Sequence, residues 1–282
     1  LLAGAVMLAL LSGCTGKDAS EHYSDGLGFI AEKQYNAAVI ELKSAVQQAP
    51  DNADYRMALG LLHLQIGDSI SAEKELAQAL KLGAEQQKVV LPLFRASYQA
   101  GSYPAVLELL SDSPLPDMLA PYADTYRALA QLELGDADAA IGLFDKLATQ
   151  QQFADVASYA QAHLLIANRN NSEAVAAAKQ VSNDSPLYQE ALYLQGRSLL
   201  AAEDYQASID VLREYLLLVP NNLQARLMLT QSLVQTAQLD DADKQLALLL
   251  KAFPSQPLVN YLKAMLEYER KDYVKAKEHA ET

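Results

Sequence analysis

The sequence predicts an all-α fold: a solenoid of antiparallel helix pairs that repeats every 34 residues and winds into a right-handed superhelix. Three observations predict it. Apolar residues recur at i, i+3, i+4 and i+7, which is typical of amphipathic helices. Prolines that end a helix keep one register, at Pro50, Pro186, Pro220 and Pro254. A mostly small residue keeps the same step through eight periods: Ala38, Ala72, Val106, Ala140, Ala174, Ser208, Ala242 and Ala276.

Residues 1–13 form an uncharged apolar run that is typical of a secretory signal peptide, since a membrane-spanning helix needs about 20 residues. Leu11, Ser12 and Gly13 precede Cys14, the only cysteine of the chain, and this order resembles a bacterial lipobox. The resemblance implies cleavage before Cys14 and lipid attachment to it, with residues 14–18 as a lipidated cysteine and short linker. Several acyl chains on one residue would anchor the chain to a membrane. The start at Leu1, without a basic leader, predicts a signal peptide truncated at its N-terminus.

The helix pairs fill residues 19–282, with repeats that start at residues 19, 53, 87, 121, 155, 189, 223 and 257. This gives seven full repeats and part of an eighth. An aromatic residue opens the second helix at Tyr35, Tyr103, Tyr205 and Tyr273. The recurring small residue lets the two helices of a pair approach closely, where overpacking would cost about 1–3 kcal/mol. One pair cannot bury its own apolar face, so neighbouring pairs must stack.

Three repeats depart from the pattern. Pro92 lies inside the first helix of the third repeat, and the prolines of segment 111–121 predict a short second helix followed by a longer loop. In the fifth repeat, Arg169 stands where other repeats have a turn glycine, so Asn170 and Asn171 are expected to take the left-handed conformation. The eighth repeat stops at Thr282 inside its second helix, which predicts that the parent protein continues.

Charge and residue spacing exclude several function classes. The net charge is -13, and an acidic body offers no electrostatic footprint for nucleic acid or anionic lipid. The four histidines lie in different repeats, and none has the spacing of a zinc site. No phosphate-binding glycine loop and no nucleophile elbow occurs. The sequence therefore predicts a protein that is not an enzyme and that has no cofactor, metal site or nucleic-acid partner.

The period and its signature positions resemble the tetratricopeptide repeat, a helix–turn–helix unit of 34 residues. In that family the first helices line a concave groove that binds other proteins. The resemblance implies groove contacts from Tyr159, His163, Tyr193 and Arg197, which occupy equivalent places in neighbouring repeats. Tyrosine-rich surfaces suit protein recognition. Further candidates in the same groove are Arg95, Tyr98, Tyr23 and Tyr261.

Two alternatives bear on this groove. Packing between adjacent repeats explains any one of its tyrosines equally well. Members of the family that bind chaperone tails place Lys at the fifth and Asn at the ninth position of a repeat to clamp a terminal carboxylate. Neither residue occurs at those positions here, so a chaperone tail is not the expected ligand.

The lipobox, the short spacer and residues 36–85 and 91–110 together resemble the tetratricopeptide lipoprotein of exosortase and PEP-CTERM sorting systems in Gram-negative bacteria. This resemblance implies a non-enzymatic, lipid-anchored scaffold that faces the periplasm and acts in exopolysaccharide or surface-protein export. Thr15 after Cys14 favours the outer membrane over the inner one. The alternatives are a lipoprotein for pilus or outer-membrane-protein assembly, and a tether for a functional domain beyond Thr282.

Overall fold

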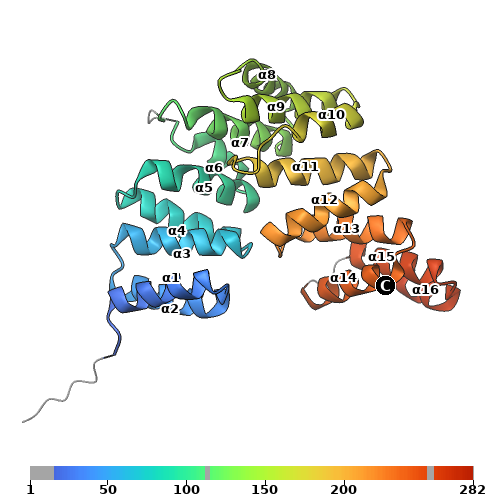
Figure 1. Ribbon diagram of the computed structural model, residues 1–282, viewed down its shortest axis with the longest axis horizontal. Helices are drawn as coiled ribbons and strands as arrows, with labels where there is room; N and C mark the ends of the chain where they lie inside the picture. Colours follow the sequence, from blue (N-terminus) through green and yellow to red (C-terminus); the bar gives the residue numbers. More distant parts are fainter. Residues whose placement is uncertain (1–15, 112–114, 253–256, 282) are drawn as a thin grey trace, which may run out of the picture.

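The computed structural model describes residues 16–111, 115–252 and 257–281, and the predicted signal peptide, Cys14 and Pro254 lie outside them. Over these residues the chain is all-α, with consecutive helices in antiparallel pairs, which confirms the predicted fold class (Figure 1). The first eight helices are α1 (Ala19–Ala31), α2 (Tyr35–Gln48), α3 (Ala53–Gln65), α4 (Ser69–Lys81), α5 (Gln86–Gln99), α6 (Tyr103–Glu108), α7 (Ala120–Glu133) and α8 (Ala137–Ala148). The next eight are α9 (Ala154–Ala167), α10 (Asn171–Ala178), α11 (Tyr188–Ala201), α12 (Tyr205–Leu218), α13 (Leu223–Gln235), α14 (Leu239–Ala252), α15 (Pro257–Glu269) and α16 (Tyr273–Ala280).

The turn inside each helix pair has one left-handed residue, and these residues recur at the 34-residue step. They are Lys33, Gly67, Gly101, Gly135, Arg169, Glu203, Ala237 and Lys271. In four pairs an aspartate follows directly and caps the second helix by accepting a hydrogen bond from a backbone N–H: Asp68, Asp136, Asp204 and Asp272. The expectation for the fifth repeat is therefore wrong. Arg169 itself has a φ of 63°, whereas Asn170 stays at −93° as the residue that precedes α10, because the register of the turn fixes which residue is left-handed.

Close packing within the pairs rests on the recurring small residue, which is buried in all eight repeats. Three first helices add a glycine that lies against a leucine of the second helix. A Cβ placed on Gly60 would lie 2.7 Å from Leu76 Cγ, and Gly26 and Gly196 are equally close to their leucines. The two helices of these pairs therefore approach so closely that only glycine, which has no Cβ, fits at these positions.

The helix pairs form an arch (Figure 1). The N-terminal arm, α1–α5, leads into an apex, α6–α10, and the C-terminal arm, α11–α16, returns on the other side. In the apex α6 has six residues, α10 has eight and α8 has 12, whereas α2, α4, α12 and α14 of the arms have 13 or 14 and the last second helix, α16, has eight. As predicted, α6 is short and a long connection separates it from α7.

Two contacts between residues far apart in sequence join the arms on the concave side. Arg95 on α5 binds Glu190 on α11. Nearer the open end, the Asn221 side-chain amide donates to the Ile66 carbonyl, which lies in the turn between α3 and α4. A Cβ placed on Gly67 would lie 3.1 Å from Asn221 Cβ, so the backbones of these two turns are also close. The concave surface is therefore bridged rather than open along its length.

Candidate functional site: a tyrosine-lined central pocket

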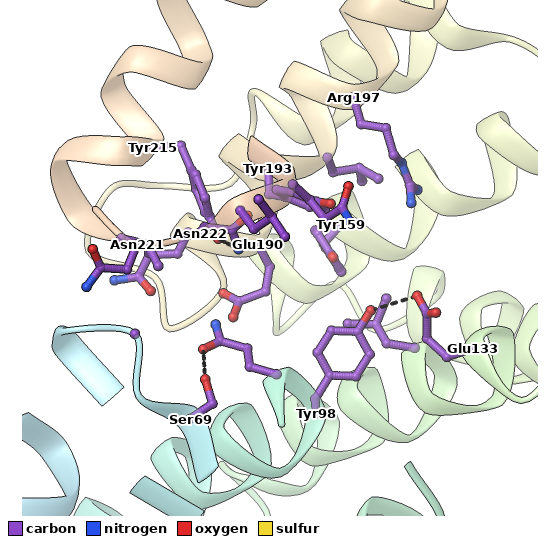
Figure 2. Close-up of a pocket in the computed structure, with 18 of the residues that line it drawn as sticks. Ser69, Tyr98, Glu133, Tyr159, Glu190, Tyr193, Arg197, Tyr215, Asn221 and Asn222 are labelled. Carbon is purple, nitrogen blue, oxygen red and sulfur yellow. Dashed lines mark hydrogen bonds between the residues drawn. The ribbon is translucent and has the colours of Figure 1, made fainter. Parts of the chain in front are cut away.

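A pocket of about 570 Å³ lies on the concave side of the arch, and we call it the central pocket. Its lining comes from α5, α6, α7, α9, α11 and α12, from the first residues of α4 and α13, and from the turns that precede these two helices. Figure 2 shows Tyr98 and Glu133 on one side and Tyr193 and Glu190 on the other. Its tyrosines are Tyr98, Tyr103, Tyr159, Tyr193 and Tyr215. Because several repeats contribute, the pocket exists only when the arms are together.

The phenols of this pocket remain protonated. Burial raises the pKa of Tyr98, Tyr159, Tyr193 and Tyr215 above the ordinary tyrosine value, so each hydroxyl is a hydrogen-bond donor at neutral pH. The Tyr98 hydroxyl donates to Glu133 Oε1 over 3.3 Å. The Tyr215 hydroxyl accepts a hydrogen bond from an asparagine side chain. Within the described residues, the hydroxyls of Tyr159 and Tyr193 make no hydrogen bond.

Arg95 and Glu190 form a bidentate ion pair in the wall of the pocket, with Glu190 in the lining and Arg95 behind it. Arg95 Nε lies 2.8 Å from Glu190 Oε1, and Nη2 lies 3.1 Å from Oε2. Tyr126 on α7 donates to Glu190 Oε1 over 2.8 Å and accepts from Arg95 Nε, and the Pro186 carbonyl accepts from Arg95 Nη2. Burial alone would lower the pKa of Arg95, but Glu190 and Tyr126 hold it above its usual value. Arg95 is therefore a fixed cation, and its Nε and Nη2 atoms donate hydrogen bonds to groups of the protein itself.

Arg197 differs from Arg95, because it is exposed in the pocket and forms no hydrogen bond or ion pair with any described residue. Its positive charge lowers the pKa of Tyr98, Tyr159 and Tyr193, partly opposing burial, which shows that these hydroxyls lie within its field. Figure 2 shows Arg197 on the same side of the pocket as Tyr193 and Tyr159, across from Tyr98 and Glu133.

His163 lies in the wall of the pocket between two aromatic rings. Its ring stacks on Phe144 with centroids 4.5 Å apart and an interplanar angle of 7°, and it meets Tyr159 edge-on at 4.8 Å. Burial, with a smaller effect from Arg197, lowers the pKa of His163 to about 3, so the imidazole is neutral. Its Nε2 atom is buried and has no hydrogen-bond partner among the described residues.

The structure brings five of the predicted groove residues together around the pocket: Tyr98, Tyr159, His163, Tyr193 and Arg197. Arg95 lies behind the lining, in the ion pair. Tyr23 stacks on Tyr55 in the N-terminal arm at 4.6 Å, and Tyr261 is 57% exposed on α15, so neither belongs to this pocket. Packing also accounts for Tyr159, which is only 3% exposed.

Sequence analysis missed several residues of the site. Glu190 occupies the second position of the sixth repeat, one of the positions that face the groove in the family, and this signal could have found it. Tyr103 and Tyr215 belong to second helices, so a search of first helices cannot find them. Tyr126 takes part because α7 lies near α11, where its hydroxyl donates to Glu190, whereas Glu133 contacts Tyr98 of the preceding repeat.

In the ranges that the structure describes, no group of three or more His, Cys, Asp or Glu side chains could hold a metal ion. None of the described helices combines the length and the apolar character that a membrane crossing requires.

Comparison with known proteins identifies the repeat. A family model described as tetratricopeptide repeat matches residues 26–87 and 159–222, and a second model with the same description matches residues 199–266. Together these segments cover more than half of the chain.

Two solved structures are similar to this chain. One is pilF of Pseudomonas aeruginosa, with 21% identity, 74% of this chain and 95% of that chain covered, and a TM-score of 0.42. The other is a tetratricopeptide repeat protein from Parabacteroides merdae, with 14% identity, 94% and 91% covered, and a TM-score of 0.41. No curated protein matches the chain.

Proposed function

This chain belongs to the tetratricopeptide-repeat family, and on that premise we propose that it is a non-enzymatic scaffold whose central pocket receives a segment of a partner protein. The observation that carries this proposal is the convergence of five tyrosines from five helices on one concave surface. Tyrosine offers apolar area and a hydroxyl group with few rotatable bonds, and it is enriched at the energetic centres of protein interfaces.

We propose further that the scaffold is anchored through lipid on Cys14 and faces the periplasm from the outer membrane. The support is the lipobox-like order before Cys14, the absence of any other thiol and the residue Thr15. The resemblance of residues 11–110 to the exosortase-associated lipoproteins supports a role in exopolysaccharide or PEP-CTERM protein export. The acidic body adds no attraction to anionic lipid, so the lipid on Cys14 has to supply the anchoring.

The anchor is tested by mass spectrometry of the N-terminus in the native host. The native chain is expected to begin at Cys14 and to carry diacylglycerol, whereas Cys14→Ser is expected to give an unprocessed precursor without lipid. A lipidated and processed N-terminus in Cys14→Ser would refute the assignment.

The partner surface is tested by photo-crosslinking in the native host. A photoreactive residue replaces Tyr193, which lines the pocket, and a control probe replaces Tyr261, which is exposed outside it. Capture of exosortase or polysaccharide-export components at Tyr193 alone supports the proposal. Capture of pilus or outer-membrane-protein assembly factors would transfer the scaffold to that machinery. Equal capture at both positions, or none, contradicts a role of the pocket in binding.

A further inference from the structure

Two cavities meet at the contact that joins the arms near the open end of the arch. The central pocket lies on one side of this contact, where Gly67 and Asn221 belong to its lining. A second cavity of about 520 Å³, which we call the outer pocket, lies on the other side. The outer pocket is lined by residues 33–37, Gln65, Ile66, Pro220 and Asn221. Asn221 is thus common to both linings, and the contact separates the two cavities.

The residue at position 67 fits this close approach of the arms. Gly67 has a φ of 82°, but the same turn position holds Lys33 and Arg169 in other repeats, so the backbone conformation alone does not require glycine. A Cβ placed on Gly67 would lie 3.1 Å from Asn221 Cβ, whereas one placed on Gly101 would meet nothing within 4 Å. The neighbouring arm is therefore what leaves no room for a side chain at position 67.

The same contact is easily broken. The hydrogen bond from Asn221 to the Ile66 carbonyl is neutral and exposed, so its net contribution is small. Arg95 and Glu190, in contrast, form a bidentate and largely buried ion pair. The apolar clusters of the described residues follow the chain, and none contains residues of both α1–α4 and α12–α16. The arms can therefore separate at the open end while the ion pair holds them together nearer the apex.

The turn that the C-terminal arm contributes is fixed to its own helices. Asn222 Oδ1 accepts a hydrogen bond from the Ala225 N–H over 2.8 Å, and its Nδ2 donates to the Tyr215 hydroxyl over 3.1 Å. The Pro220 carbonyl accepts from Arg226 Nη2. Opening of the contact therefore moves one arm relative to the other rather than unfolding the turn. Because Tyr215 lines the central pocket, Asn222 also connects this turn directly to the pocket wall.

We propose that the Asn221–Ile66 contact is a latch on the central pocket, which opens to admit the partner segment from the open end of the arch and closes again over it. The inference rests on the proposed scaffold function and adds how access to the same site is controlled. While the latch is closed, the backbones of the two turns meet, so an internal segment of a partner cannot be laid across both pockets. When the latch is open, the central and outer pockets form one continuous groove between the arms.

The first test locks the latch with a disulfide. The full chain carries Gly67→Cys and Asn221→Cys, Cys14→Ser to remove the remaining thiol, and a photoreactive residue in place of Tyr193. The two Cβ positions are close to the separation of about 3.5–4.5 Å that disulfides require, so oxidation is expected to join the turns. The purified protein is mixed with membranes of the native host that lack the native chain. It is oxidised before mixing, oxidised after mixing, or kept reduced.

Oxidation before mixing is expected to lower partner capture at Tyr193 by about tenfold or more relative to the reduced protein, because the locked latch blocks entry. Oxidation after mixing is expected to preserve capture of the same partner, because the latch closes over the bound segment. The matched controls are Gly67→Cys alone and Asn221→Cys alone, each of which should capture equally with and without oxidant.

The second test loosens the latch without a disulfide. Asn221→Ala removes the hydrogen bond to the Ile66 carbonyl and is expected to accelerate capture about two- to tenfold, the factor that corresponds to one neutral hydrogen bond. Asn170→Ala removes an exposed asparagine of another turn, outside both pockets, and should leave the rate unchanged. If the disulfide variant does not fold, this rate decides, and an unchanged rate in Asn221→Ala overturns the latch.

The failures are distinguishable. Equal capture by the reduced protein and by the protein oxidised before mixing overturns the latch and leaves the scaffold function intact. Loss of capture in both orders of oxidation means that the partner occupies only an open arch, and it overturns the closing step. No capture at Tyr193 by the otherwise native chain contradicts the proposed binding role of the pocket, and the latch with it.

Discussion

The N-terminal arm and the apex of the arch are built from the same 34-residue unit, but they differ in the length of their second helices and in their helical glycines. In the arm, α2 and α4 are long, and Gly26 and Gly60 bring paired helices into contact. In the apex, α6 and α10 are short, and a Cβ placed on Gly142, the one glycine within its described helices, would meet no neighbouring atom within 4 Å. Two short second helices, α6 and α10, lie in the region where the array reverses direction, on either side of α8 with its 12 residues (Figure 1). The central pocket depends on the reversal, because it brings Tyr98 opposite Tyr193.

The strongest test of this comparison removes the ion pair that the reversal makes possible. Arg95→Gln leaves Glu190 without its cation and is expected to destabilise the protein by about 3 kcal/mol, since breaking a largely buried pair exposes one partner's desolvation cost. It is also expected to increase the radius of gyration in small-angle scattering. Arg56→Gln breaks the Arg56–Glu75 pair inside the N-terminal arm. It should lower the unfolding free energy without changing the overall dimensions, and an expansion in both variants would refute the arm-joining role of Arg95.

The second test uses the neutral histidine of the apex. The pKa of His163 is about 3 in the folded protein and about 6.5 in the unfolded chain. At pH values between 3 and 6.5 the unfolded chain therefore binds more protons than the folded one. Stability is therefore complete above pH 6.5 and falls as the pH drops toward 3, by about 2 kcal/mol at pH 5. Denaturant titrations of the native chain and of His163→Phe, which keeps a ring against Phe144, isolate this contribution. The unfolding free energy of His163→Phe should change much less between pH 7 and pH 5 than that of the native chain. An equal change in both would refute the assignment of this pH dependence to His163.

The third test compares the two kinds of helical glycine. Gly60→Ala places a methyl group 2.7 Å from Leu76 Cγ and 3.1 Å from its backbone nitrogen, and is expected to cost about 2 kcal/mol. Gly142→Ala meets nothing within 4 Å and is expected to add up to about 1 kcal/mol through helix propensity. Thermal unfolding of both variants measures the difference. The same sign for both would contradict the close contact between Gly60 and Leu76.

The smallest effect is expected at the turns. Arg169, at a φ of 63°, occupies the position that glycine holds at Gly101 and Gly135. Arg169→Gly relieves a left-handed side-chain penalty of roughly 1–2 kcal/mol but adds freedom to the unfolded chain, so a net gain below about 1 kcal/mol is expected. Chemical denaturation of this variant and of Gly135→Arg, which should lose stability, checks the assignment.

The sequence predicts those features that recur. A constant step places Ala38 and Ala276 at equivalent buried sites, and short-range rules account for the capping aspartates and for the short α6. The same rules place Tyr159 and Tyr193 on first helices. They cannot predict that Arg95 meets Glu190, because the curvature of a solenoid is the accumulated result of small rotations at every interface. The pocket is therefore partly predictable, to the extent that it lies on first helices.

The Arg95–Glu190 contact also changes how the array is expected to unfold. In a linear solenoid each repeat touches only its neighbours, so end repeats can fray while the middle persists. Here the pair closes a chain loop between residues 95 and 190. Opening any interface within that loop has to strain or break the ion pair, and opening one between it and residues 66 and 221 has to strain the Asn221–Ile66 hydrogen bond. Interfaces beyond Ile66 and Asn221 can separate one at a time. The protein should therefore have a cooperative centre between less protected ends, with slow amide hydrogen exchange from α5 to α11 and faster exchange in α1 and α16.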